Sequence, residues 1–194
     1  MNPLRTFRLF EITIAIVCMA IPALLRLADS GYPGFRPSIS DYVYMPRSYI
    51  FGMLLTVGAM LFIYNGAVYF NNERVFGLNS AGKWYNVVLG LSLIGIILLP
   101  YKQHVALHYS FAGIFFVGNA LVTAFFHRPQ FAVLSIALAV LTLVAIVLHF
   151  WGGFLSLLAA EWISLTVIGI HFILEATGVI DPLEQQSNIL QDRE

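Results

Sequence analysis

Six long apolar segments constrain the fold of this chain more than any other feature of its sequence. They cover residues 8–28, 48–70, 84–101, 104–126, 131–150 and 154–177. A helix needs about 20 apolar residues to cross a bilayer, and in lipid its backbone polar groups must be satisfied internally. The segments therefore predict an all-α polytopic membrane protein, a six-transmembrane-helix bundle that forms one integral membrane domain over residues 1–194.

The composition agrees with this class of protein. Only 10% of the residues are charged, whereas soluble proteins carry about 25%. The ten basic and ten acidic residues cancel, so no excess positive charge is present to attract nucleic acid, and we expect no nucleic-acid partner. The single cysteine, Cys18, lies in the first apolar segment, where we expect it to pack as a small hydrophobic residue.

The positions of lysine and arginine predict the orientation of the chain. Most connections are short, so neighbouring helices should be antiparallel, and the segment ends then fall alternately on two sides. Basic residues favour the cytoplasm, and the side of the amino terminus holds more of them. That side has Arg5, Arg8, Arg74, Lys83, Arg128 and Arg193, against Arg26, Arg36, Arg47 and Lys102. We therefore expect both termini in the cytoplasm, in a plasma or inner membrane.

Two histidines open the fourth segment. His104 and His108 are four residues apart, so on a helix they share one face, about 6 Å apart. Such a pair can bind zinc if a third ligand joins it, and Asp41, His149 and Glu161 are the candidates. The alternative is that both histidines simply form hydrogen bonds to loop carbonyls at the membrane surface.

A polar stripe runs along the sixth segment. It consists of residues spaced three or four apart: Glu161, Ser164, Ile168, His171 and Glu175. A polar stripe on a membrane helix faces the bundle interior or a water-filled cavity. We expect Glu161 to be buried and paired, as a structural link or a catalytic carboxylate, with partners among Arg26, Arg47, Lys102 and the histidines. His171 and Glu175 should form a second polar cluster with Glu11 near the cytoplasmic side.

The predicted topology gathers polar residues at the non-cytoplasmic face, next to the long loop of residues 29–47. The candidate catalytic residues are His104, His108, Asp41 and Glu161, and the candidate metal ligands are His104, His108 and His149. Candidates for a polar path or a lipid head-group site are Ser40, Lys102, Ser164, His171 and Glu175. Zinc is the metal that such a site would hold.

Short motifs in three regions resemble the DRAM/Frag/Sfk-type six-helix membrane family. They are Pro37-Ser-Ile-Ser-Asp41, the His104/His108 pair followed by Ala112-Gly-Ile-Phe-Phe116, and Ala160-Glu-Trp162 with Phe172 and Thr177. The loop segments Gly31-Tyr-Pro-Gly34 and Asp41-Tyr-Val43 are similar to an uncharacterised prokaryotic six-helix membrane family. The resemblance implies a lipid-related role in the membrane and does not identify a reaction.

We expect the polar site to bind, sense or remodel a membrane lipid. One alternative is a metal-dependent intramembrane hydrolase or transferase, in which His104, His108 and a third ligand activate water on a metal. Another is a small transporter or channel with a polar path along the sixth segment. These alternatives leave open whether the chain is an enzyme, and assembly into a homo-oligomer is compatible with each of them.

Overall fold

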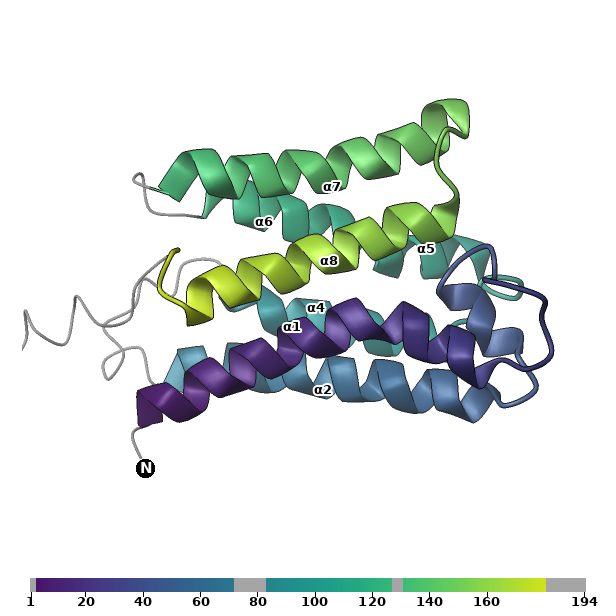
Figure 1. Ribbon diagram of the computed structural model, residues 1–194, viewed down its shortest axis with the longest axis horizontal. Coiled ribbons are helices and arrows are strands. Elements are labelled where there is room, and N and C mark those ends of the chain that lie inside the picture. Colours follow the sequence, from purple (N-terminus) through teal and green to yellow (C-terminus); the bar gives the residue numbers. More distant parts are fainter. Residues whose placement is uncertain (1–2, 72–82, 127–130, 181–194) are drawn as a thin grey trace, which may run out of the picture.

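The computed structural model describes residues 3–71, 83–126 and 131–180, and every regular element in these ranges is a helix (Figure 1). The elements are α1 (Pro3–Ala28), η1 (Ser40–Tyr44), α2 (Ser48–Asn71), α4 (Tyr85–Leu98), α5 (Val105–Gly113), η2 (Ile114–Gly118), α6 (Asn119–Phe125), α7 (Ala132–Gly152) and α8 (Leu157–Ala176). The all-α prediction is confirmed, and the helices match the expected segments closely.

Within the described residues, five helices are long and apolar enough to cross a membrane: Thr6–Ala28, Ser48–Tyr69, Val105–Phe125, Ala132–Gly152 and Leu157–Ala176. The remaining one, α4, has 14 residues, about 21 Å at 1.5 Å per residue, against a hydrocarbon core of about 30 Å. The predicted segment 84–101 is too long because Pro100 disfavours a helical conformation at Leu99, whose ψ is 76°.

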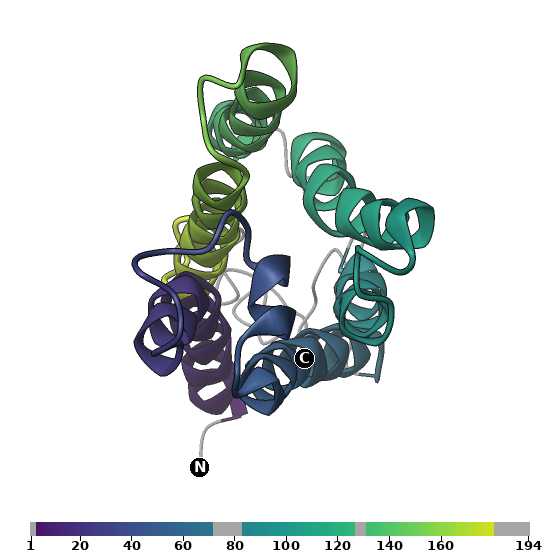
Figure 2. The same cartoon turned by 90° about the vertical axis from the view of Figure 1, so that its right-hand side faces the viewer.

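The helices form a ring when the molecule is viewed from one end (Figure 2). In this ring α1 lies between α2 and α8, α4 packs on α2, and α7 packs on both α8 and α6. Residues 29–47, 99–104 and 153–156 all lie at one end, which we call the loop end. The short helix η1 covers the centre of the ring there and packs on α2 and α4.

Apolar side chains fill the centre of the ring and also cover its outside. The fully buried residues include Phe51, Phe62 and Phe115. The outward side chains of α7, such as Val133 and Val140, are exposed and apolar. A soluble monomer rarely exposes large contiguous apolar areas, and this surface is compatible with a protein embedded in lipid.

The apolar helix Val105–Phe125 contains a wide turn. The helices α5 and α6 are joined without a break by η2, a π-helical turn. A π turn disturbs the regular hydrogen-bond ladder, and here the hydroxyl of Tyr85 on α4 donates a hydrogen bond to the Ile114 carbonyl at 2.7 Å. The same hydroxyl occupies the space that a Cβ at Gly118 would need, so α4 and this turn fit together closely.

The long loop after α1 is held by a buried ion pair. Asp29, which is 1% exposed, accepts a hydrogen bond from the Arg36 Nε at 2.6 Å and another from the Gly31 backbone N–H at 3.2 Å. The Arg36 guanidinium also lies 5.1 Å from the centre of the Tyr32 ring. The hydrogen bond from Arg36 lowers the pKa of Asp29 below its ordinary value.

Gly90 on α4 allows the close approach of α2. A Cβ at this position would lie 2.5 Å from both the Ala59 carbonyl oxygen and the Ile63 side chain. We predict that Gly90→Ala lowers the free energy of unfolding by about 1–3 kcal/mol, because the Ala59 backbone cannot move aside. The measurement is the thermal midpoint of the purified protein in detergent. The control is Gly52→Ala on α2, where an added Cβ meets nothing within 4 Å, and equal midpoints for the two variants would contradict the prediction.

The ion pair of Asp29 predicts a pH-dependent contribution to stability. Because the folded-state pKa of Asp29 is lowered, its contribution is complete above the unfolded pKa of about 4 and is lost as the pH falls through the folded pKa. We therefore expect Asp29→Asn to melt below the wild type at pH 7. The difference should persist at pH 5 and shrink below pH 4, as thermal melts at several pH values would show. A difference that grows on acidification would contradict this account.

Candidate functional site

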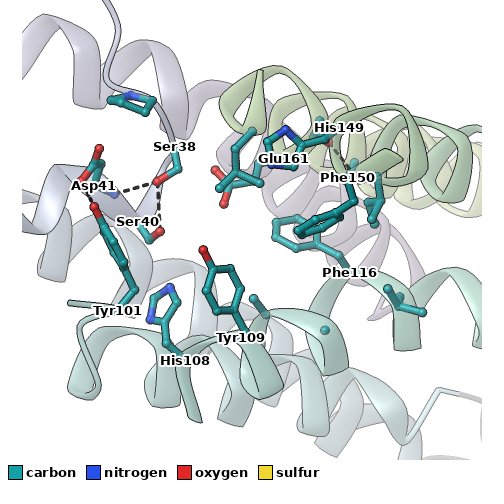
Figure 3. A pocket seen from close by; sticks show the side chains of 18 residues that line it. Ser38, Ser40, Asp41, Tyr101, His108, Tyr109, Phe116, His149, Phe150 and Glu161 are labelled. Carbon is teal, nitrogen blue, oxygen red and sulfur yellow. Dashed lines mark hydrogen bonds between the residues drawn. The ribbon is translucent and has the colours of Figure 1, made fainter. Parts of the chain in front are cut away.

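A cavity of about 460 Å³ lies at the loop end, between the 29–47 loop, α5 with η2, α7 and α8 (Figure 3). Its polar lining consists of Ser38, Ser40, Asp41, Tyr101, His108, Tyr109, His149, Glu161 and Ser164. Its apolar lining includes Ala112, Phe116, Val117, Ile146, Phe150 and Leu157. The chain thus brings Asp41, His108 and Glu161 together as predicted, from three separate elements.

Glu161 joins the loop to α8. Its Oε2 accepts a hydrogen bond from the backbone N–H of Ile39 at 2.6 Å, although the two residues are far apart in the sequence. One turn earlier on α8, the backbone N–H of Leu158 donates to the Pro37 carbonyl at 2.8 Å. These two bonds fix the loop over the cavity. The start of α8 is itself set by Ser156, whose Oγ accepts from the Ala159 N–H at 3.1 Å.

The partner of Glu161 differs from the expected one. Within the described residues no cation pairs with this carboxylate. Arg26 donates to the Asp29 carbonyl at 3.2 Å. The Lys102 ammonium lies 4.1 Å from the centre of the Tyr44 ring and does not line the cavity. Glu161 is half-buried at the cavity wall, and a backbone N–H takes the place that we expected for a positive charge.

Asp41 and the two nearby serines form a connected group. The Asp41 Oδ1 accepts a hydrogen bond from the Tyr101 hydroxyl at 2.9 Å. The Asp41 backbone N–H donates to Ser38 Oγ at 3.1 Å, and the hydroxyls of Ser38 and Ser40 lie 3.1 Å apart. Burial, together with the hydrogen bond to Asp41, raises the pKa of Tyr101 to about 12, so this hydroxyl is a hydrogen-bond donor at neutral pH.

His108 presents one nitrogen to the cavity. Its Nδ1 lies 2.8 Å from the Leu99 carbonyl oxygen. A carbonyl can only accept, so Nδ1 carries the proton. The side chain is almost fully buried and points toward Ser40 and Tyr101 (Figure 3). Its Nε2 has no hydrogen-bond partner within the described residues, and in the neutral ring this nitrogen is an acceptor for a ligand.

His104 does not share this face, and the prediction that it does is wrong. It precedes α5 and has φ −134° and ψ 54°, so the spacing rule for a helix does not apply to it. The Pro100 turn binds its backbone, since the His104 N–H donates to the Pro100 carbonyl at 3.0 Å. The side chain is exposed and lies outside the cavity lining.

The predicted metal ligands do not converge. His149 lines the cavity from α7, and its Nδ1 lies 3.0 Å from the Leu155 carbonyl oxygen. Across residues 3–71, 83–126 and 131–180, no three His, Cys, Asp or Glu side chains are grouped so that they could hold one metal ion. Because His104 lies outside the helix, the i, i+4 pair on which the zinc hypothesis depended does not form.

The second polar cluster lies at the end opposite the loop end. Lys83 forms an ion pair with Glu175, and His171 Nδ1 lies 3.7 Å from the same carboxylate. Glu11 accepts a hydrogen bond from the Tyr69 hydroxyl at 3.0 Å. Sequence reasoning missed Tyr69 and the neighbouring pair in which Asn86 donates to Asn65 at 2.6 Å, because their apolar helices have no regular polar pattern.

An apolar layer separates this cluster from the cavity. The stripe on α8 has Ser164 at the cavity wall and Glu175 at the opposite end, and Ile168 between them is 1% exposed. Ile168 belongs to the same buried core as Phe62 and Phe172. The hydroxyl of Ser164 donates to the Ala160 carbonyl at 2.8 Å within its own helix. The stripe therefore forms two separate polar groups rather than one continuous polar path.

The bond between Glu161 and Ile39 predicts that α8 protects the loop. We expect Glu161→Ala to release the loop and expose Tyr42, which is 0% exposed in the native fold. Limited chymotrypsin digestion should then cut after Tyr42 at least tenfold faster than in the wild type. Glu161→Gln is the matched control, because its amide oxygen can still accept from the Ile39 N–H. Equal cleavage of the wild type and the alanine variant would show that other contacts hold the loop.

Comparison with known proteins assigns the chain to a family and to no activity. No curated protein and no solved structure matches the chain significantly. The resemblance to the DRAM/Frag/Sfk-type proteins stays a prediction, because the family match does not bear on it. Residues 20–176 match a family of unknown function, DUF7103. This range includes the 29–47 loop, the residues that line the cavity and the whole of α8. The chain therefore belongs to the DUF7103 family of unknown function.

Proposed function

We propose that this protein binds a membrane lipid, with the lipid head group in the loop-end cavity and the acyl chain along its apolar wall. The observation that carries this proposal is the division of the cavity lining. Asp41, His108 and Glu161 contribute polar groups, whereas Phe116, Ile146 and Phe150 contribute apolar surface from η2 and α7. A volume of about 460 Å³ is within the usual range for a small-molecule site.

The arrangement of the helices supports entry of a lipid into the cavity from the surrounding bilayer. Near the cavity, α7 packs on α8 and touches η2, but it packs little against α5. The cavity is lined from both α5 and α7, so its apolar wall lies where these two helices diverge. A lipid in the surrounding bilayer presents its acyl chain at that level, and the chain could remain in the membrane while the head group enters.

The proposal includes the membrane topology. Six spans with both termini in the cytoplasm place the loop end at the non-cytoplasmic leaflet of a plasma or inner membrane. The bias of basic residues toward the side of the amino terminus supports this orientation.

Gly113 offers a direct test of lipid binding. It lines the cavity, and a Cβ added there would meet no atom within 4 Å. We predict that Gly113→Phe fills the cavity, preserves the fold and lowers the amount of bound lipid at least tenfold. The measurement is native mass spectrometry of the protein purified from membranes in a neutral detergent.

The matched control for this test is Gly52→Phe. Gly52 lies on α2, outside the cavity lining, and a Cβ there also meets nothing within 4 Å. This variant should retain bound lipid at the wild-type level, with the same thermal midpoint as Gly113→Phe. Undiminished lipid in a folded Gly113→Phe protein would overturn the proposed site.

A further inference from the structure

The loop-end cavity is lined by two acidic side chains, Asp41 and Glu161, and by two histidines. No lysine or arginine contributes to the described lining. Two basic residues near the loop make other contacts. Arg36 pairs with Asp29, and the ammonium of Lys102 lies over the Tyr44 ring.

Each carboxylate keeps one oxygen for a ligand. Asp41 uses Oδ1 to accept from Tyr101, and Glu161 uses Oε2 to accept from the Ile39 N–H. Within the described residues, neither Asp41 Oδ2 nor Glu161 Oε1 accepts a hydrogen bond. The Nε2 of His108 is a third acceptor on the same cavity. The cavity therefore has more acceptors than donors, and a ligand that donates hydrogen bonds would complement it.

Aromatic rings line the same space. Tyr101 and Tyr109 stand on one side of the cavity, and Phe116 and Phe150 lie toward its apolar wall (Figure 3). The face of an aromatic ring attracts a cation within about 6 Å. Rings therefore favour the same kind of ligand group as the two carboxylates do.

From these observations we infer that the ligand of the loop-end cavity is an amphiphile with a protonated amine head group. This inference rests on the proposed lipid-binding function and names the chemical class of the lipid. An ammonium group donates three hydrogen bonds and carries a positive charge, which complements the carboxyl groups of Asp41 and Glu161. A phosphate head group would instead bring further negative charge beside two acidic side chains, with no lysine or arginine in the described lining to offset it.

Three amphiphiles with the same tail test this inference: dodecylamine, dodecanol and dodecyl phosphate. Each is added to the purified full-length protein in a neutral detergent, below the concentration at which it forms micelles. Native mass spectrometry measures the bound fraction. We expect dodecylamine to bind at least tenfold more tightly than dodecyl phosphate, and more tightly than dodecanol.

Two variants test the role of the carboxylates. Glu161→Gln and Asp41→Asn each keep an acceptor for the existing protein hydrogen bond and remove one negative charge. Each should weaken the binding of dodecylamine about tenfold and leave that of dodecanol within about twofold. Glu175→Gln makes the same chemical change in the opposite cluster, outside the cavity, and should leave the binding of dodecylamine unchanged.

The outcomes separate this inference from the proposed function. Preferred binding of dodecyl phosphate, equal binding of dodecanol and dodecylamine, or an amine preference that survives in the Asp41→Asn/Glu161→Gln double variant would overturn the inference. In each of these cases Gly113→Phe would still abolish binding, so the lipid site would stand. Failure of all three amphiphiles to bind, together with unchanged lipid in Gly113→Phe, would overturn both.

Discussion

The hydrogen bond from the Ile39 N–H to Glu161 is the interaction on which the loop end depends. It joins a loop near the start of the chain to a helix near its end. Without it, the described contacts between this loop and α8 would include the Leu158–Pro37 backbone hydrogen bond and the contact between the Phe35 and Trp162 rings. A carboxylate in an apolar helix is costly. Here the hydrogen bond from the Ile39 N–H offsets part of that cost, and the same bond positions the polar wall of the cavity.

The sequence predicts the helices better than it predicts the site. The segments are readable because each has a long apolar run, and α1, α2 and α8 end within a few residues of the predicted bounds. The error at the end of α4 comes from Pro100, whose effect on Leu99 shortens the helix. By length alone five of the described helices can cross a bilayer, since α4 falls short of the usual bilayer core.

The site predictions divide according to whether a residue lies inside a regular helix. His108 and Glu161 lie on helices and face the cavity as periodicity predicts. His104 stands one residue outside α5, and a helical spacing rule fails at that boundary. Tyr101 was not predicted, because its position depends on the Pro100 turn and on the approach of Asp41. No pattern within one segment reveals such a contact between segments.

The π turn in η2 has a consequence for how the two ends of the molecule are related. One extra residue in a helix rotates everything beyond it by about 100° relative to a regular helix. Before the turn, His108 and Ala112 face the cavity, and beyond it Asn119 and Thr123 face a small recess beside Glu175. A deletion of one residue from 114–118 would regularise the helix but turn these two residues away. The extra residue in this turn thus determines that one helix can present polar side chains to both the cavity and the recess.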